Sequence, residues 1–123
     1  MKPRLLLLAE DEATSRLLLS RMLQELGFEV LEAKDGLQAL AYLKDRRDEI
    51  SAVFTDAHLP GLEGFELFAI MQASKDLQFI PAILVSADDG LRSFARSKGF
   101  CGWIHKPIQL ADLRHLLTLI GLL

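Results

Sequence analysis

Short runs of apolar residues alternate along the chain with longer segments in which apolar positions recur at helical spacing. The apolar runs cover residues 4–9, 28–33, 50–55, 80–85 and 100–105, and the periodic segments cover residues 13–26, 36–46, 63–74, 88–98 and 109–120. A continuous apolar run of about four to eight residues is typical of a strand buried on both faces, whereas apolar positions roughly three or four residues apart indicate an amphipathic helix. The sequence therefore predicts strands and helices in regular alternation.

Glycine and proline residues divide these segments. Gly27 and Gly99 follow periodic segments, and Pro60 with Gly61 marks a turn after the third apolar run. Glycine is the usual residue just past a helix end, and proline with glycine is a strong turn signal. Alternating strands and helices favour a parallel sheet covered by helices on both faces. We therefore expect a single α/β domain over residues 1–123, with five strands and five helices.

Composition narrows the class of protein. The chain has 123 residues and a formal net charge of -3. It contains no long run of basic residues of the kind that binds nucleic acid directly. A single cysteine, Cys101, excludes a disulfide framework, favours a reducing compartment and is expected to be a small apolar filler. No apolar stretch approaches the roughly 20 residues of a membrane helix. We expect a soluble, cytoplasmic protein.

Polar residues with reactive or metal-binding side chains follow the ends of the predicted strands. The first strand leads into Glu10 and Asp11, the third into Asp56, the fourth into Ser86 and the fifth into Lys106. In a parallel sheet the carboxyl ends of the strands share one edge, and ligands bind there at a topological switch point. If the first and third strands are neighbours, three carboxylates converge in one crevice with a hydroxyl and an ammonium beside them.

Three such carboxylates repel one another. At about 4 Å and an effective dielectric near 20, each pair costs on the order of 4 kcal/mol before relaxation. A divalent cation offsets this repulsion, and a set of oxygen ligands favours Mg²⁺. A metal and an ammonium together suit phosphoryl transfer, in which one carboxylate is the nucleophile and becomes an aspartyl phosphate.

These residues resemble the receiver domains of two-component response regulators, over the whole chain. The resemblance rests on four segments, which are Leu6-Leu7-Leu8-Ala9-Glu10-Asp11-Glu12, Asp56-Ala57-His58-Leu59-Pro60-Gly61-Leu62-Glu63-Gly64, Val85-Ser86-Ala87 and Lys106-Pro107-Ile108. The resemblance implies a flavodoxin-like doubly wound sheet with strand order 2-1-3-4-5. It also implies a phosphorelay function, in which a histidine kinase or a histidine phosphotransfer protein donates the phosphoryl group.

The resemblance assigns the phosphoacceptor and metal ligands. Asp56 matches the phosphorylated aspartate, and Glu10 and Asp11 match the acidic pair that holds Mg²⁺ together with Asp56. The backbone carbonyl of His58 matches the remaining protein ligand, and Lys106 matches the lysine that pairs with the phosphoryl group. These positions retain every chemical group that the family's reaction needs.

Further positions match the family's switch. Ser86 corresponds to the hydroxyl that bonds the phosphoryl group, and Ala87 to the small residue beside it. Trp103 corresponds to the switch aromatic, and the peptide bond before Pro107 is expected to be cis. The surface formed by the fourth helix, fifth strand and fifth helix is then expected to bind a downstream partner.

Several residues depart from the family's commonest pattern or have simpler explanations. The acidic pair is Glu-Asp, and Trp103 is bulkier than the usual aromatic, while His105 replaces a small or apolar residue. Taken alone, Ser86 is a candidate N-cap for a helix beginning at residue 88 or 89, and Trp103 a residue that only covers the core. Glu12 is expected to cap the first helix rather than bind metal.

Other functions remain as alternatives. A pseudo-receiver that acts only as a protein-interaction module would normally have lost the acceptor or the lysine. A flavin-binding protein needs a hydroxyl- and glycine-rich phosphate loop, but Glu10-Asp11-Glu12 occupies that place. An aspartyl phosphatase would want a second acid where His58 stands. As a receiver the chain turns over no external metabolite and is not an ordinary enzyme. Its apolar C-terminus, residues 119–123, is compatible with a homodimer surface or a linker.

Overall fold

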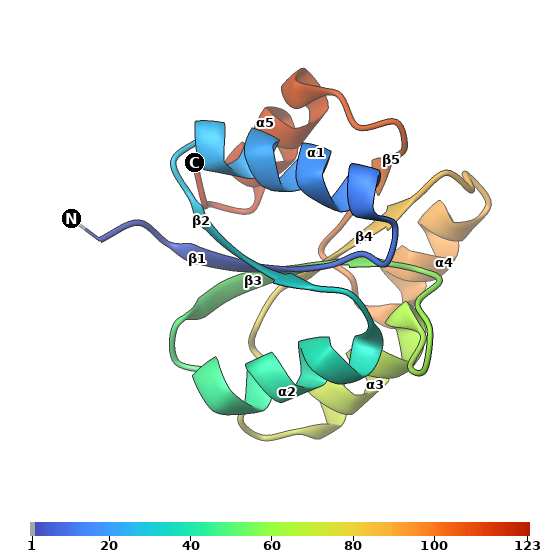
Figure 1. Ribbon diagram of the computed structural model, residues 1–123. Coiled ribbons are helices and arrows are strands. Elements are labelled where there is room, and N and C mark those ends of the chain that lie inside the picture. The colour runs from blue at the N-terminus through green and yellow to red at the C-terminus, as the bar shows by residue number, and fades with distance from the viewer. Residues whose placement is uncertain (1) are drawn as a thin grey trace.

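Five strands and five helices alternate along the chain in the computed structural model, which describes residues 2–123 (Figure 1). The strands are β1 (Leu5–Ala9), β2 (Glu29–Ala33), β3 (Ile50–Asp56), β4 (Ala82–Ser86) and β5 (Gly102–His105). The helices are α1 (Ala13–Glu25), α2 (Gly36–Arg46), α3 (Gly64–Ala73), α4 (Leu91–Lys98) and α5 (Leu110–Leu119). All strand pairs are parallel, in the order β2-β1-β3-β4-β5. The predicted fold class and strand order are confirmed.

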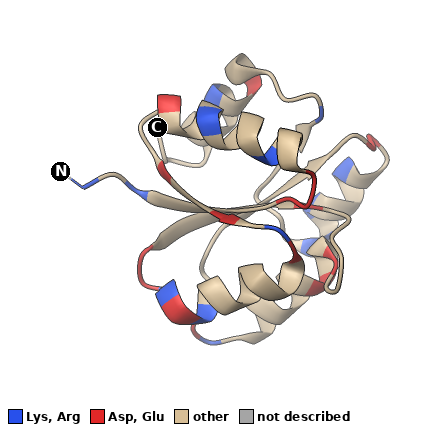
Figure 2. Cartoon of the chain, in the orientation of Figure 1, with Lys and Arg blue, Asp and Glu red and all other residues tan. Residues whose placement is uncertain are grey.

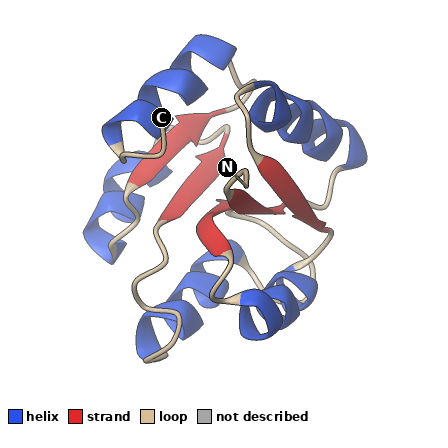
Figure 3. Ribbon diagram, turned by 90° about the vertical axis from the view of Figure 1, so that its left-hand side faces the viewer, coloured by secondary structure: helices blue, strands red, loops and turns tan. Residues whose placement is uncertain are grey.

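The sheet lies between two layers of helices (Figures 1 and 3). Helices α1 and α5 cover one face, and α2, α3 and α4 cover the other. Successive residues of β1 point to opposite faces, so that Leu5 and Leu7 join one core cluster while Leu6 and Leu8 join the other. A strand buried on both faces must be apolar throughout, which explains the continuous run of leucines.

The loop before α4 is longer than the sequence predicts. Helix α4 begins at Leu91 instead of residue 88, and its N-cap is Gly90 rather than Ser86. The Ser86 hydroxyl accepts a hydrogen bond from the Asp88 amide at 3.0 Å, and an Asp88 carboxylate oxygen accepts one from the Gly90 amide at 2.9 Å. These two local bonds compete with helix formation and hold residues 87–90 in a loop.

The expectation that Cys101 is a small apolar filler is wrong. Cys101 is exposed, because β5 begins only at Gly102 and the preceding residue lies at the surface. On α1 the buried residues are Leu19, Ser20 and Leu23, whereas Leu17 and Leu18 are 51% and 49% exposed. The apolar stripe of α1 is therefore wider than the surface that the sheet covers. No helix within residues 2–123 has the length and hydrophobicity needed to cross a membrane.

Candidate functional site

The four strand ends identified in the sequence meet at one edge of the sheet. Glu10 and Asp11 follow β1, in the acidic segment that leads into α1 (Figure 2), and Asp56 is the last residue of β3. Ala9 pairs with Thr55 in the sheet, which brings the carboxyl ends of β1 and β3 together. Lys106 follows β5 and reaches back across β4 to the acids. The site therefore lies at the topological switch point between β1 and β3. The connection after β1 leads to β2 on one side, and the connection after β3 leads to β4 on the other, as expected for a doubly wound sheet.

The three carboxylates are close enough to share one ion. One carboxylate oxygen from each of Glu10, Asp11 and Asp56 lies within 4.8 Å of the others. Lys106 Nζ donates a hydrogen bond to Asp56 Oδ2 at 2.7 Å and another to Glu10 Oε1. Glu10 is only 3% exposed, whereas Asp11 is exposed to solvent. The ammonium thus pairs with the two inner acids, Glu10 and Asp56, and leaves Asp11 without a cationic partner among the described residues.

The pKa values of Glu10 and Lys106 are both raised above their ordinary values, for different reasons. Burial of Glu10 is the largest effect and, with the neighbouring Asp56, raises the pKa of the Glu10 carboxyl against the opposing pull of Lys106. Burial by itself would lower the pKa of Lys106. Its hydrogen bonds to Asp56 and Glu10 outweigh this and raise the pKa of the ammonium above its ordinary value. Lys106 is consequently a permanent cation at neutral pH.

The donor set fits a magnesium ion. Mg²⁺ holds oxygen ligands at about 2.0–2.1 Å, so any two ligands of one ion lie within about 4.2 Å of each other. The carboxylate oxygens of Glu10, Asp11 and Asp56 all lie within 4.8 Å of one another, a separation close to that limit. The structure thus brings together the predicted acidic ligands. It does not test whether the His58 carbonyl joins them, and that assignment stays a prediction.

The turn after β3 fixes the orientation of Asp56. The amide of His58 donates to Asp56 Oδ1 at 3.2 Å, while Lys106 holds Oδ2. Helix α3 starts against the end of β3, because the Gly64 amide donates to the Ala57 carbonyl at 3.0 Å. A Cβ on Gly64 would lie 2.1 Å from the Asp56 carbonyl oxygen, so this position has no room for a side chain. The close approach explains why glycine ends the Asp56–Gly64 segment.

The end of β4 completes the rim of the site. Ser86 is buried, and Ala87 is exposed beside a cavity of about 320 Å³ that Asp56 and Lys106 also line. The peptide bond between Lys106 and Pro107 is cis, and Pro107 forms part of the same cavity. The Asp56 carboxylate therefore lines a hollow that has a small side chain, Ala87, at its edge.

Arg16 is a site residue that sequence reasoning missed. From α1 its Nη1 donates to the Glu10 carbonyl at 2.9 Å and to the Asp11 carbonyl at 3.3 Å, while Nε pairs with Glu32 at 3.4 Å. The guanidinium thereby holds the loop that carries the acidic pair. An arginine in the second turn of a helix is common, so no signal in the sequence distinguishes this one.

Glu12 caps α1, as the sequence predicts. Its two carboxylate oxygens accept hydrogen bonds from the amides of Thr14 at 3.1 Å and Ser15 at 2.6 Å. Hydrogen bonds from Ser15 and Thr14 lower the pKa of the Glu12 carboxyl to about 2. With both oxygens engaged at the helix end, Glu12 remains outside the metal-ligand cluster.

Two aromatic residues of β5 lie on the face of the sheet that α4 covers. Trp103 is partly buried, with the Arg92 guanidinium 5.6 Å from its ring centroid and the His105 ring 5.5 Å away. The indole Nε1 of Trp103 is buried and has no hydrogen-bond partner among the described residues. His105 pairs with Asp89 at 3.4 Å, whereas His58 is an exposed loop residue that pairs with Glu63 at 3.2 Å.

Comparison with known proteins defines the class. The family model for the response regulator receiver domain matches residues 6–118. The chain is 32% identical over 118 residues to chemotaxis protein CheY-3 of Vibrio cholerae, covering 94% of this chain and 89% of that protein. It is 30% identical over 112 residues to the two-component response regulator-like PRR37 of rice, covering 89% of this chain but only 15% of that protein.

A solved structure shares the whole architecture. The receiver domain of the sensor histidine kinase PA1611 from Pseudomonas aeruginosa, described with a magnesium ion coordinated in its active site cleft, has a TM-score of 0.86. The two chains are 28% identical, and the match covers 98% of this chain and 99% of the other. The protein belongs to the response regulator receiver domain family of two-component signalling.

Proposed function

We propose that this chain is a phosphorylation switch in which Asp56 accepts a phosphoryl group from a histidine kinase or a histidine phosphotransfer protein. The observation that carries the proposal is the position of Lys106, whose ammonium bridges Asp56 and Glu10 at the mouth of a cavity. An oriented carboxylate nucleophile with a fixed cation beside it is the arrangement that phosphoryl transfer requires.

The transfer exchanges one bond for another. An oxygen of Asp56 forms a bond to phosphorus as the bond between phosphorus and the donor's imidazole nitrogen breaks, and that nitrogen keeps the electron pair. The His58 amide and Lys106 hold the carboxylate in one orientation before the reaction. As charge gathers on the phosphoryl oxygens, Lys106 can follow them without leaving the site, because its stem is anchored at the end of β5.

We further propose that Glu10, Asp11, Asp56 and the His58 carbonyl hold Mg²⁺. When bound, the metal supplies positive charge opposite the developing charge of the phosphoryl oxygens. The gathering of three carboxylate oxygens within 4.8 Å supports these ligands. Arg16 positions Glu10 and Asp11 through their carbonyl oxygens.

The apolar surface beside the site is the proposed docking surface for the phosphodonor. Leu18 and Ile108 line the cavity that contains Asp56, and Leu17 is exposed on the same helix as Leu18. A donor histidine must approach Asp56 within bonding distance, so its protein has to cover this rim. Exposed leucines next to a polar site are the kind of surface that such a protein buries.

Phosphorylation is proposed to act through Ser86 and Trp103. The Ser86 hydroxyl, held in this structure by the Asp88 amide, would move to donate a hydrogen bond to the phosphoryl group, with Ala87 leaving room. The loop of residues 87–90 would follow, and with it α4, the cover of Trp103. A downstream partner would then recognise the surface of α4, β5 and α5, whereas a homodimer would form through the apolar C-terminus, residues 119–123. We assign residues 1–123 to one receiver domain acting in the cytoplasm.

Phosphorylation of Asp56 tests the proposal directly. Acetyl phosphate with Mg²⁺ should add one acid-labile phosphoryl group, measured by intact mass, and Asp56→Asn should abolish it. Asp76→Asn is the matched control, since Asp76 pairs with Arg47 away from the site. Full labelling of Asp56→Asn would remove the claim. Absence of labelling in the unmodified protein would favour the pseudo-receiver alternative.

A further inference from the structure

One side-chain contact ties the end of β5 to the loop before α4. His105 Nε2 lies 3.4 Å from Asp89 Oδ1. His105 is the last residue of β5 and pairs in the sheet with Ser86, the last residue of β4. The Lys106 amide donates to the Ser86 carbonyl at 3.0 Å, so the two strand ends are held together. The contact therefore joins a fixed strand end to the loop of residues 87–90.

Asp89 belongs both to this loop and to the start of α4. Its carbonyl accepts a hydrogen bond from the Arg92 amide at 3.2 Å. Its neighbour Asp88 donates its amide to the Ser86 hydroxyl at 3.0 Å. Asp89 thus lies between the hydroxyl of the proposed switch and the first turn of α4. A contact that restrains Asp89 restrains the loop as well.

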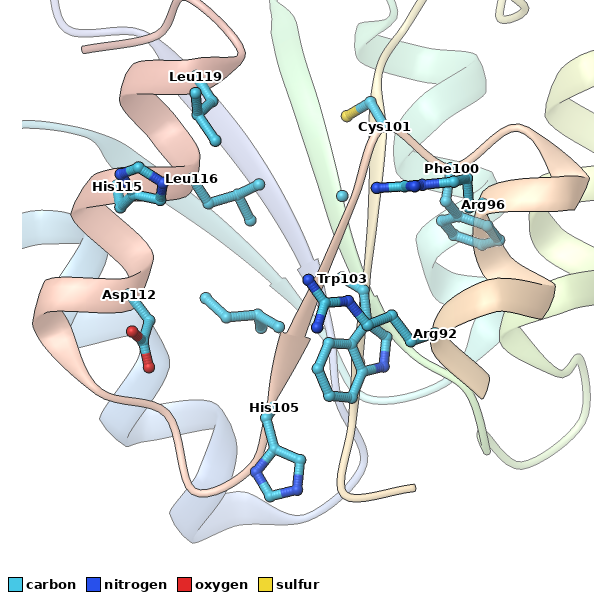
Figure 4. A pocket seen from close by; sticks show the side chains of 12 residues that line it. Arg92, Arg96, Phe100, Cys101, Trp103, His105, Asp112, His115, Leu116 and Leu119 are labelled. Carbon is cyan, nitrogen blue, oxygen red and sulfur yellow. The ribbon is translucent and has the colours of Figure 1, made fainter. Parts of the chain in front are cut away.

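His105 makes this contact from the face of β5 that also carries Trp103. Figure 4 shows both side chains beside a cavity of about 410 Å³, with Arg92 over the indole. The ring centroids of Trp103 and His105 are 5.5 Å apart. Within residues 2–123, Asp89 is the residue that forms an ion pair with His105. The other charged or titratable groups around this end of β5 are Asp88 of the loop, Arg92 and Arg96 of α4, Cys101 before β5, Lys106 after it, and Asp112 and His115 of α5.

The strength of the contact depends on the charge of His105. Histidine is the side chain that changes its charge between about pH 5 and pH 8. A protonated ring and the Asp89 carboxylate attract each other as an ion pair, whereas a neutral ring offers one hydrogen bond at most. The two side chains are 45% and 83% exposed, so the attraction is that of a surface pair. Such a pair shifts an equilibrium by a few fold without locking it.

We propose that His105 and Asp89 are positioning residues for Ser86. Protonated His105 holds Asp89, keeps residues 87–90 in the arrangement of this structure and opposes the movement of Ser86 toward a phosphoryl group on Asp56. As pH rises and His105 loses its charge, the loop is released and the switch turns more readily. The inference rests on the proposed function and deepens it, because it makes the switch depend on pH through a residue outside the metal-ligand cluster.

Beryllofluoride, which mimics the phosphoryl group, provides the assay. Its affinity is measured by isothermal titration calorimetry with saturating Mg²⁺ for the unmodified protein, His105→Gln, Asp89→Asn and the double variant. At about pH 5.5 each single variant should bind about 1.5- to fivefold more tightly than the unmodified protein, and the double variant no more tightly than either. At about pH 8 the four affinities should converge. The cycle isolates the contact, because all other charges are the same in the four proteins.

His115→Gln is the matched control, since His115 is exposed on α5, lines the same cavity and has no ion-pair partner among the described residues. It should keep the affinity of the unmodified protein at both pH values. An equal effect of His105→Gln at the two pH values, additive effects of the two substitutions, or weaker binding by His105→Gln at about pH 5.5 would overturn the proposal. So would an effect of His115→Gln as large as that of His105→Gln.

Amide hydrogen exchange tests the same contact without phosphorylation. At about pH 5.5 the amides of Gly90 and Leu91 should exchange faster in His105→Gln than in the unmodified protein, while those of β1 should not change. Equal exchange of the loop amides in the two proteins would contradict the proposed restraint even if Asp56 accepts a phosphoryl group. Failure of the unmodified protein to bind beryllofluoride concerns the proposed function, and the exchange measurement then decides on the contact alone.

Discussion

Replacing Asp11 by asparagine is expected to have opposite effects on stability without and with magnesium. The Asp11 carboxylate lies within 4.8 Å of those of Glu10 and Asp56, and no cation among the described residues pairs with it. Because Asp11 is exposed, the interaction is that of charges in water, about 1 kcal/mol for each pair at this distance. In a chelator, Asp11→Asn should therefore raise the free energy of unfolding by about 1 kcal/mol, after partial screening by Lys106.

Magnesium should make the unmodified protein more stable than Asp11→Asn. A single ion that binds only the folded protein adds about 1.4 kcal/mol of stability for each tenfold rise in its concentration above the dissociation constant. Asp11→Asn loses an anionic ligand, so its stability should begin to rise only at higher magnesium concentrations. The stability curves of the two proteins should then cross.

Urea unfolding at fixed pH, in chelator and across a magnesium series, measures both effects. A domain of 123 residues is small enough for a two-state treatment. Asp76→Asn serves as the control, because it removes the same charge far from the cluster. If Asp11→Asn followed the magnesium dependence of the unmodified protein, Asp11 would not be a ligand. If it were less stable in chelator, carboxylate repulsion would not be what the metal relieves.

Four other substitutions or titrations test separate parts of the site. Arg16→Gln should weaken magnesium binding about tenfold, since it releases the loop that carries the acidic pair. Gly64→Ala should cost about 1–3 kcal/mol in urea unfolding, because its Cβ meets the Asp56 carbonyl; an unchanged midpoint would contradict the geometry. The pKa of Glu10 is raised in the folded protein, so protonated Glu10 stabilises the fold. This stabilisation is complete below pH 4.5, the ordinary pKa of a glutamate, and is lost as pH rises through the folded-state pKa. In chelator the protein should therefore lose stability relative to Glu10→Gln over that range, and a relative gain would show that the bond to Lys106 dominates. Trp103, the single tryptophan, should change its emission and iodide quenching when beryllofluoride binds; identical spectra would make it a structural residue only.

The fold and the position of the site were predictable because both depend on strong signals in the sequence. Buried parallel strands must be apolar on both faces, and polar residues directly after them must share one edge of the sheet. That reasoning located Glu10, Asp11, Asp56 and Lys106 correctly, and the strand order came from the family resemblance.

What the sequence did not predict depends on the direction of single side chains. Arg16 reaches the carbonyl oxygens of the acidic pair because the chain turns from β1 into α1 and brings the guanidinium back over the connecting loop. The late start of α4 depends on the hydrogen bonds that the Asp88 amide donates to Ser86 and that the Gly90 amide donates to Asp88, which compete with an otherwise acceptable helix. The exposure of Cys101 follows from a strand boundary displaced by two residues from the prediction. Such outcomes are decided by tertiary geometry and leave no periodic signal.

Helix α4 is held to the sheet by few buried side chains, so its amide hydrogens should exchange with solvent early. Ala95 is the only fully buried residue of this helix, and its N-cap makes no side-chain hydrogen bond. Helix α3, by comparison, buries Leu67, Phe68 and Met71. Local opening of α4 should therefore cost far less than global unfolding, so its amides should exchange early while those of β1 and β3 persist. The helix that covers Trp103 is then the one whose order can change most easily.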